Sequence, residues 1–312
     1  MSDATPPKAS PSLRVAVSGA SGLVGTELTT QLQQDGRKVL RLVRGSGSSS
    51  PGEIAWDPDG GTIDAAALEG LDAVVHLAGE SIAQGRWTAA KKERILRSRE
   101  DGTRLISQAV AGLDRPPRVL LCASAVGYYG DRGETRLDED SASGDGFLAD
   151  VCRRWEAAAD PARERGIRVV HARLGVVLSG RGGALAKMLP PFKFGLGGVI
   201  GSGRQYMSWI ALEDAASAMQ FLLTRDQVQG PVNLVAPTPV TNREFTKTLG
   251  QVLHRPTVLP MPAFAARLAL GEMADELLLV SQRVEPVRLQ QAGFRFRYAG
   301  VQPALVAAVR QS

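Results

Sequence analysis

The sequence predicts an α/β protein with a doubly wound parallel sheet, followed by a smaller and mainly helical C-terminal part. Two observations carry this prediction: short apolar runs alternate with longer segments of helical period, and this alternation stops near residue 190. Such alternation indicates βαβ units, in which helices cover both faces of a parallel sheet. The runs lack strict polar alternation, as expected for strands that are buried on both faces.

The expected strands and helices follow one another through the first 175 residues. We expect strands at residues 13–18, 39–43, 73–77, 119–123 and 167–172. We expect helices at residues 23–34, 88–111 and 147–165. Two prolines at 190 and 191 and the Gly-rich stretch 195–203 break the pattern, so we place the start of the smaller part nearby.

Composition excludes several classes of protein. Of the 312 residues, 44% are hydrophobic and 22% charged, which are ordinary proportions for a globular protein. No apolar run comes near the ~20 residues that span a bilayer, and the first twelve residues lack the apolar core of a secretion signal. Two cysteines, Cys122 and Cys152, favour a reducing compartment over a disulfide scaffold. We expect a cytoplasmic protein without a membrane partner.

The net charge of +5 raises the question of nucleic acid. Residues 86–104 hold seven basic and three acidic side chains, whereas residues 131–145 hold six acidic and two basic ones. A nucleic-acid binder is usually marked by a basic stripe with interleaved aromatic residues or by a known module, and neither occurs. The basic stretch is either a solvated helix face or one wall of a pocket for an anionic small molecule. Metal-ligand spacing is also absent, so no metal is expected.

Three glycines separate the first expected strand from the first expected helix, with the spacing G-x-x-G-x-x-G. Glycine lets backbone N–H groups approach phosphate oxygens, and a helix N-terminus adds partial positive charge. This order of elements is typical of a site for a dinucleotide pyrophosphate. The residues that we expect to contact the cofactor there are Gly19, Ser21, Gly22, Leu23, Val24 and Gly25.

Arg44 ends the second expected strand, about twenty residues after the glycines. An NAD site usually places an acidic residue here for the ribose 2′-hydroxyl, whereas arginine suits the 2′-phosphate of NADP. We therefore expect NADP(H), with Arg44 reading the phosphate and Ser46 or Arg41 assisting. The alternative is a solvated arginine at a strand end.

Further motifs occur along residues 13–310. They include D-A-V-V-H-L-A-G at 72–79, G-R-W-T at 85–88, S-A-V-G-Y-Y-G at 124–130, G-F-L-A-D at 146–150, W-E at 155–156 and S-Q-R-V at 281–284. With the glycine turn, this set resembles the atypical, extended short-chain dehydrogenases/reductases of the branch called the epimerase family. The resemblance implies an NADP-binding Rossmann-type domain and a smaller domain that closes over a substrate cleft. By the family pattern, Leu77, Ala78, Gly79 and Glu80 would also face the cofactor.

The domain boundaries follow from the motifs and the break in periodicity. We expect a disordered tail at 1–12, an NADP-binding Rossmann domain at 13–178 and a smaller substrate-side domain at 179–312. Residues 205–236 should return in part to the Rossmann domain.

The catalytic pair of short-chain dehydrogenases is missing. These enzymes use Tyr-x-x-x-Lys on one helix face, where the lysine lowers the tyrosine pKa for proton exchange with a substrate oxygen. Four positions after the four tyrosines stand Arg132, Gly133, Ile210 and Gln302. By position, Phe147 and Val151 fall where the pair would be.

Few polar residues can replace this pair. Ser124 ends an expected buried strand, and Tyr129 follows it in a loop at the carboxyl end, where open α/β sheets place ligands. We name Ser124 and Tyr129 as candidate catalytic residues, and Tyr128 and Arg204 as candidates for binding substrate. The alternative is structural, because serines at strand ends and aromatic residues in loops are common.

Two functions fit these observations. The first is an NADP-dependent oxidoreductase or nucleotide-sugar-epimerase-like enzyme that acts on a small polar or anionic substrate. The second is a non-catalytic NADP(H)-binding sensor or scaffold, which the missing pair favours. A monomer and a homodimer are both compatible with the sequence.

Overall fold

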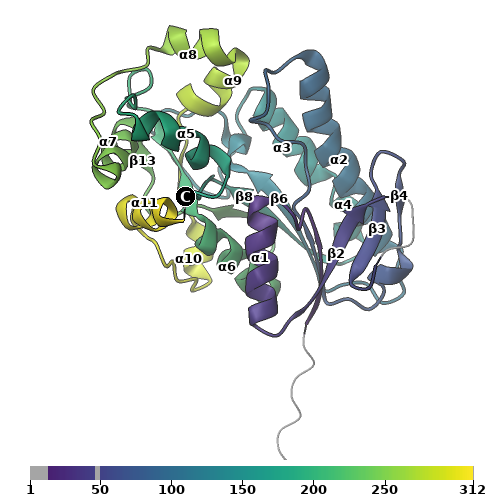
Figure 1. Ribbon diagram of the computed structural model, residues 1–312. Helices are drawn as coiled ribbons and strands as arrows, with labels where there is room; N and C mark the ends of the chain where they lie inside the picture. The colour runs from purple at the N-terminus through teal and green to yellow at the C-terminus, as the bar shows by residue number, and fades with distance from the viewer. Residues whose placement is uncertain (1–12, 46–49, 312) are drawn as a thin grey trace, which may run out of the picture.

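The expected parallel sheet forms in the computed structural model, which describes residues 13–45 and 50–311. Along the chain the strands of the main sheet are β1 (Arg14–Ser18), β2 (Lys38–Arg44), β3 (Glu53–Asp57), β4 (Thr62–Ile63), β5 (Ala73–His76), β6 (Val119–Ala125), β8 (Arg168–Leu174) and β12 (Gly230–Leu234). They lie in the order β12-β8-β6-β5-β1-β2-β3-β4 (Figure 1), and every neighbouring pair is parallel except β3 and β4. The predicted fold class is therefore confirmed. The expected tail at 1–12 and Ser46 lie outside the described residues.

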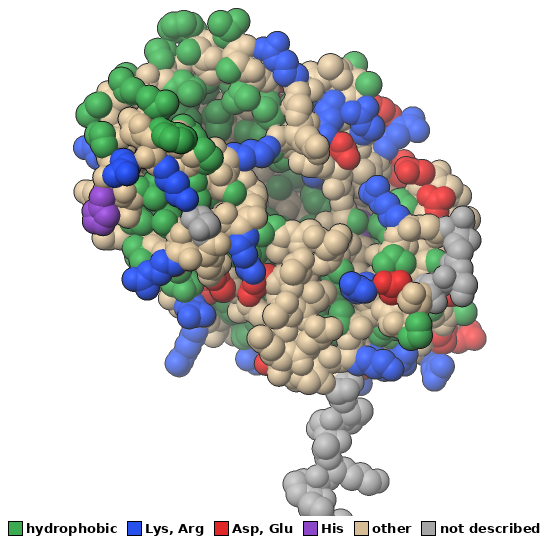
Figure 2. Space-filling model, in the orientation of Figure 1, with side chains coloured by type: hydrophobic (Ala, Val, Ile, Leu, Met, Phe, Trp, Pro, Cys, Tyr) green, Lys and Arg blue, Asp and Glu red, His purple; other side chains and the backbone are tan. Residues whose placement is uncertain are grey.

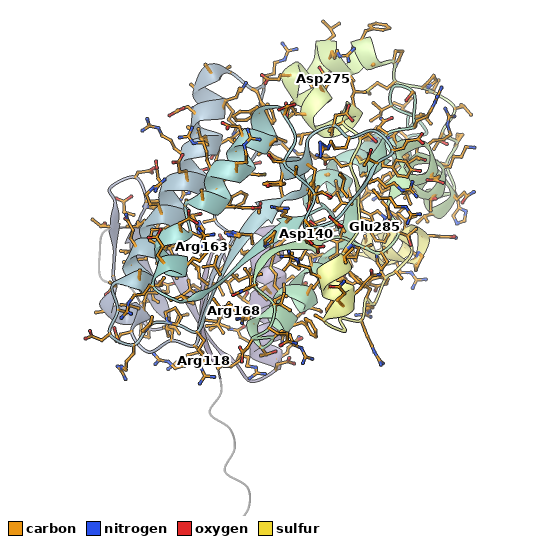
Figure 3. All side chains as sticks on the ribbon, turned by 180° about the vertical axis from the view of Figure 1, so that it is seen from behind. Arg118, Asp140, Arg163, Arg168, Asp275 and Glu285 are labelled. Carbon is orange, nitrogen blue, oxygen red and sulfur yellow. The ribbon has the colours of Figure 1, made fainter. Side chains whose placement is uncertain are left out.

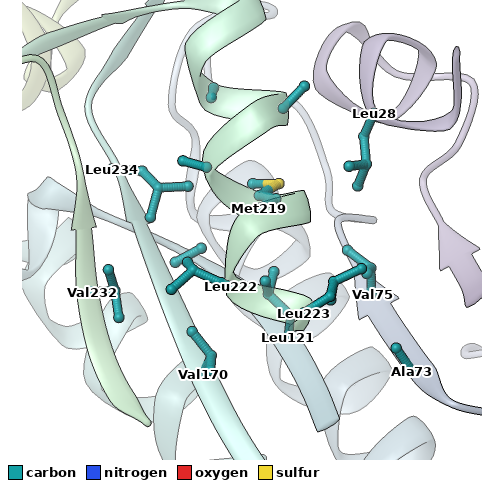
Figure 4. Close-up of a cluster of buried hydrophobic side chains, with 14 of the residues drawn as sticks. Leu28, Ala73, Val75, Leu121, Val170, Met219, Leu222, Leu223, Val232 and Leu234 are labelled. Carbon is teal, nitrogen blue, oxygen red and sulfur yellow. The ribbon is translucent and has the colours of Figure 1, made fainter. Parts of the chain in front are cut away.

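Helices cover both faces of this sheet. Helices α1 (Leu23–Gln34) and α6 (Leu212–Leu223) pack on one face, and α2 (Ala89–Ala111), α3 (Phe147–Ala157) and α4 (Asp160–Glu164) lie on the other. On the first face, Met219, Leu222 and Leu223 of α6 pack on the strand residues that Figure 4 labels, among them Val75 and Leu121. Alternate strand residues point to opposite faces, so each buried strand contributes to both cores.

The main sheet and its helices differ from the sequence prediction in two places. The helix expected at 147–165 is divided into α3 and α4, because Pro161 at the start of α4 cannot continue a preceding helix. Strands β3 and β4 were not expected. They extend the sheet at its edge, where β3 pairs in parallel with β2.

The remaining elements form the C-terminal part and its links to the sheet. The strands are β7 (Arg136–Leu137), β9 (Val176–Leu178), β10 (Tyr206–Met207), β11 (Trp209–Ala211), β13 (Val240–Thr241) and β14 (Arg283–Val284). The helices are α5 (Gly183–Lys193), α7 (Asn242–Leu253), α8 (Ala263–Leu270), α9 (Glu272–Ala274), α10 (Val287–Gln291) and α11 (Val301–Arg310). Short helical turns, η1 to η3, span Ala66–Leu68, Val126–Tyr129 and Asp275–Leu279.

Residues 181–208 and 238–270, which we call the cap, contain α5, α7 and α8. Between its two segments the chain returns to the main sheet, since α6 packs on one face and β12 pairs with β8. Figure 1 shows the cap above and to one side of the sheet. In the described part of the chain, none of the helices combines the length and apolar character that crossing a bilayer demands.

Candidate functional site

The glycine turn between β1 and α1 is folded tightly on itself. Gly19 has a φ of +67°, and Gly22 N donates a hydrogen bond to Gly19 O at 2.9 Å. A Cβ on Gly25 would lie 2.1 Å from that same oxygen, and a Cβ on Gly19 would lie 2.8 Å from Ala78 N. Any larger residue at position 19 or 25 would therefore collide with backbone.

The start of α1 is available to an anion. Gly22 is the N-cap residue, and among the described residues no side chain caps this helix. The N–H groups of the first turn, together with the helix dipole, can therefore bind phosphate oxygens. The turn has the form that a dinucleotide pyrophosphate needs. The individual contacts expected from Ser21, Leu23 and Val24 stay predictions.

A buried serine joins the ends of β1 and β5. Ser18 Oγ lies 2.6 Å from His76 Nδ1 and accepts hydrogen bonds from Leu77 N at 3.1 Å and Ala78 N at 3.4 Å. These contacts hold residues 77–79 against the glycine turn. The structure therefore brings together the two segments that we expect to face the cofactor.

Glu80 lies among cations just after these residues. Its carboxylate accepts a hydrogen bond from Lys91 Nζ at 2.5 Å and lies 4.0 Å from Arg94 Nε. The hydrogen bond from Lys91, with the charges of Lys91, Arg94 and Arg44, lowers the pKa of Glu80 despite some desolvation. Arg44, the last residue of β2, is exposed and contributes to this field. The end of β2 and the start of α2 thus form one positively charged region around a single carboxylate.

The nearby basic residues differ in their surroundings. Arg41 pairs with Glu53 at 2.9 Å, so its guanidinium is engaged along the sheet edge. Arg99 is half-buried, donates to Glu80 O at 3.0 Å and has its guanidinium carbon 5.0 Å from the centre of the Trp155 ring. Arg97, in contrast, is on the exposed face of α2. The basic stretch therefore includes a solvated face and some inward-facing cations, and the pocket for an anionic small molecule stays a prediction.

A buried network of polar side chains lies at the carboxyl ends of β6 and β8. Ser124 Oγ donates to Glu156 Oε1 at 2.7 Å, and Arg173 donates to both oxygens of Glu156, at 2.8 and 2.9 Å. Arg173 Nη1 also donates to Tyr129 OH at 3.0 Å, and that hydroxyl donates to Asn233 Oδ1 at 2.7 Å. Arg173 is only 3% exposed. The network links β6, α3, β8 and β12 through one bidentate ion pair.

This network contains both candidate catalytic residues. Ser124 and Tyr129 are fully buried, and burial raises the pKa of Tyr129 to about 12, although the charge of Arg173 acts in the opposite direction. Tyr128 is half-buried, with its ring 3.5 Å from the guanidinium carbon of Arg173. Arg204 lies apart from the network, exposed on the cap turn before β10. The structure thus brings three of the four candidates together.

The two residues that bind the network together were missed from the sequence. Glu156 belongs to the W-E motif, and Arg173 is a charged residue between Ala172 and Leu174 near the end of β8, a strand that also holds Arg168 and His171. A charge in a buried strand requires a partner, so Arg173 was the signal that could have revealed the pair.

Comparison with known proteins identifies the family. The model of the NAD dependent epimerase/dehydratase family matches residues 15–235. This chain belongs to that family. A second model, described as a domain of unknown function (DUF1731), matches residues 261–308. The resemblance drawn from the motifs is therefore confirmed.

Several relatives of this epimerase/dehydratase family member match nearly the whole chain. An epimerase family protein of Mycobacterium bovis is 48% identical over 291 residues, which are 93% of this chain and 96% of the relative. The crystal structure of human epimerase family protein SDR39U1 with NADPH is 35% identical, with a TM-score of 0.86, and the match covers 96% of this chain and 100% of the human one. A nucleoside-diphosphate sugar epimerase from Corynebacterium glutamicum is 38% identical, with a TM-score of 0.78, over 96% of this chain and 58% of the other.

In this family member, the helix face expected to carry the Tyr/Lys pair is apolar. Phe147 packs edge-on against Trp87, with ring centroids 5.2 Å apart, and Lys92 Nζ lies 4.6 Å from the Phe147 ring. Val151 is buried in a cluster with Ile95. Neither position can donate or accept a side-chain proton.

Glu276 connects the C-terminal part to the same helix. Its two carboxylate oxygens accept hydrogen bonds from Phe147 N at 3.1 Å and Leu148 N at 3.2 Å, at the positive end of the α3 dipole. Lys92 of α2 pairs with Glu272 at 2.7 Å. These acids hold the segment after the cap onto the Rossmann-type domain.

The S-Q-R-V motif has a structural role in this family member. Its strand β14 pairs in parallel with β7, and Ser281 Oγ donates to Gly133 O at 2.5 Å. Figure 3 shows Asp140 and Glu285 close together on the far side, where Arg288 pairs with Asp140 at 2.7 Å. The acidic stretch 131–145 therefore includes contacts that bind the C-terminal segment.

We expect the stability of the domain to depend on pH through His76. Burial, with a smaller effect of the Arg99 charge, lowers the pKa of His76 to about 3. In the unfolded chain the pKa is about 6.5, so below that pH the unfolded state gains a proton that the folded state does not. We expect the free energy of unfolding to fall between about pH 6.5 and pH 3, by up to about 1.4 kcal/mol per pH unit.

Denaturant titrations at a series of pH values test this expectation. His76→Asn should flatten the fall, whereas His254→Asn, at an exposed position, should leave it unchanged. Equal slopes for wild type and His76→Asn would contradict the assignment.

Proposed function

We propose that this protein binds NADP(H) and acts as an atypical oxidoreductase or nucleotide-sugar-epimerase-like enzyme of the short-chain dehydrogenase/reductase type. When bound, the nicotinamide carries hydride. The substrate we propose is small and polar or anionic, and the compartment is the cytoplasm, in keeping with two buried free cysteines.

The observation that carries the proposal is the glycine turn with Arg44 beside it. A Cβ at position 19 would collide with the backbone of residues 77 and 78, and a Cβ at position 25 would collide with Gly19 O within the turn itself. Arg44 stands where an NAD site usually holds an acid. A human relative with 35% identity was crystallised with NADPH, which supports the same cofactor here.

A second function rests on the apolar face of α3. Phe147 and Val151 stand at the positions where we expect the Tyr/Lys pair, and the Tyr129 hydroxyl is buried against Arg173 and Asn233, so none of these three side chains offers a proton to a substrate. A non-catalytic NADP(H)-binding sensor or scaffold would need the cofactor site alone. Consumption of NADPH with a carbonyl compound or a nucleotide sugar would favour the enzyme.

Titration of the protein with NADPH and with NADH, followed by fluorescence of the reduced nicotinamide, tests the cofactor assignment. We expect NADPH to bind at least tenfold more tightly than NADH, because a charge-assisted contact to the 2′-phosphate is worth about 1.5–3 kcal/mol. Arg44→Ala should remove most of this preference and leave NADH affinity nearly unchanged.

Arg41→Ala is the matched comparison, and it also tests the assisting role that we considered for Arg41. It removes an arginine from the same strand, but one whose guanidinium pairs with Glu53 at 2.9 Å. Arg41→Ala should change the affinity for NADPH less than threefold. If neither cofactor bound, or if the two single variants weakened NADPH equally, the role of Arg44 would be wrong.

A further inference from the structure

The large hydrophobic side chains that are strongly exposed in the described part of the chain all lie in the cap. They occur at residues 194–196 and 258–268, which we call the apolar patch. Phe194 is 80% exposed, Leu268 77%, Val258 75% and Phe264 71%. Single exposed apolar residues are ordinary, but a group confined to one region marks a surface for contact with another body.

The two segments of the patch form one continuous surface. Met261 N donates to Val199 O at 2.8 Å, and Gly201 N donates to Met261 O at 2.8 Å, so the segments run side by side. Helix α8 continues directly from them, with Phe264 and Leu268 four residues apart and both exposed. Figure 2 shows hydrophobic side chains gathered over this part of the molecule, with Lys and Arg side chains around them.

The cap also carries the positive charge of the protein. Its two segments contain eight basic residues and one acidic residue, and all eight basic residues are exposed. They are Arg181, Lys187, Lys193, Arg204, Arg243, Lys247, Arg255 and Arg267. Because the whole chain has a net charge of +5, the cap accounts for +7 and the remainder for −2. Two of these cations pair with acids outside the cap, Arg181 with Glu27 at 2.6 Å and Arg267 with Asp275 at 2.9 Å, which lowers the charge that the cap presents to a partner.

We propose that the cap docks onto an anionic phospholipid surface, with the apolar patch inserted among the headgroups and the basic side chains against the lipid phosphates. Apolar side chains beside a cationic border are the combination by which peripheral proteins bind such surfaces. The charge argues against a second copy of this chain, because two caps face to face would set one positively charged surface against another. From the sequence we expected no membrane partner, but a surface contact needs no spanning segment.

Sedimentation of the full chain with vesicles tests the proposal. One set of vesicles contains phosphatidylglycerol and phosphatidylcholine in equal parts, and the other contains phosphatidylcholine alone. We expect binding to the anionic vesicles to be at least tenfold tighter. It should weaken strongly between about 0.1 M and 1 M salt, where the Debye length falls from about 10 Å to 3 Å.

Two pairs of variants separate the apolar and charged contributions. Phe264→Ser with Leu268→Ser should lower anionic-vesicle affinity at least tenfold, with the thermal midpoint and NADPH affinity unchanged because both side chains are exposed. Lys247→Glu should lower it several-fold, whereas Lys38→Glu, an equal charge change at an exposed position outside the cap, should not.

Three results would overturn the proposal. These are no sedimentation with anionic vesicles, equal binding to both kinds of vesicle, and an oligomer in light scattering that Phe264→Ser with Leu268→Ser converts to monomer. The last would show that the patch binds another copy of the chain. Phe264 and Leu268 are not among the residues that we expect to bind the cofactor, so NADPH affinity serves as an independent control.

Discussion

Glu156→Ala should lower the free energy of unfolding by about 3–5 kcal/mol, because it leaves a buried guanidinium without its counter-charge. Arg173 is 3% exposed and gives two hydrogen bonds to Glu156. Burial alone would lower the pKa of Arg173, but the hydrogen bonds and charge of Glu156 outweigh burial and hold it above its ordinary value. Denaturant unfolding at neutral pH measures the loss.

Two further variants show whether charge is the cause. Arg163→Ala breaks an exposed pair with Asp160 and should cost no more than about 1 kcal/mol. Glu156→Met combined with Arg173→Met removes both charges and should recover at least half of the loss, since well-packed apolar residues often replace a buried pair without penalty. A loss below about 1 kcal/mol for Glu156→Ala would mean that water reaches Arg173.

Local patterns predicted the parts of the site that depend on neighbouring residues. The glycine turn could be placed because strand, turn and helix follow one another within residues 14–34, and Arg44 because it ends the next strand. The buried network could not be placed in this way. Ser124, Glu156 and Asn233 are far apart in sequence, and only the lateral order of β6, β8 and β12 brings their strands together with α3.

There are also physical reasons why some elements were not predicted from the sequence. Strand β3 alternates buried and half-buried residues and follows a Gly/Ser-rich stretch, so it lacks the continuous apolar character of the central strands. The division between α3 and α4 depends on Pro161, whose effect on a helix is local and could have been anticipated. The absence of the Tyr/Lys pair, in contrast, was evident from the sequence alone.

Gly25→Ala should abolish NADPH binding or weaken it at least tenfold. The added Cβ would lie 2.1 Å from Gly19 O and 2.9 Å from Ala20 Cα, and both are backbone atoms that cannot rotate away. Relief requires the turn to open, which moves the N–H groups at the start of α1 away from a bound phosphate. Overpacking of this kind also costs about 1–3 kcal/mol of stability, so unfolding and cofactor titration should be measured together.

A series of glycine-to-alanine variants distinguishes an effect on the glycine turn from a general loss of stability. A Cβ on Gly112, which has a φ of −83°, would meet its nearest atom at 3.6 Å, and Gly112→Ala should bind NADPH as the wild type does. At Gly22 the nearest atom, Gly19 O, would be 3.2 Å away, so Gly22→Ala should have an intermediate effect. If affinity follows these distances while the variants stay folded, the turn itself holds the cofactor. If folded Gly25→Ala binds NADPH normally, the turn is not the phosphate site, and the cofactor proposal loses the observation that carries it.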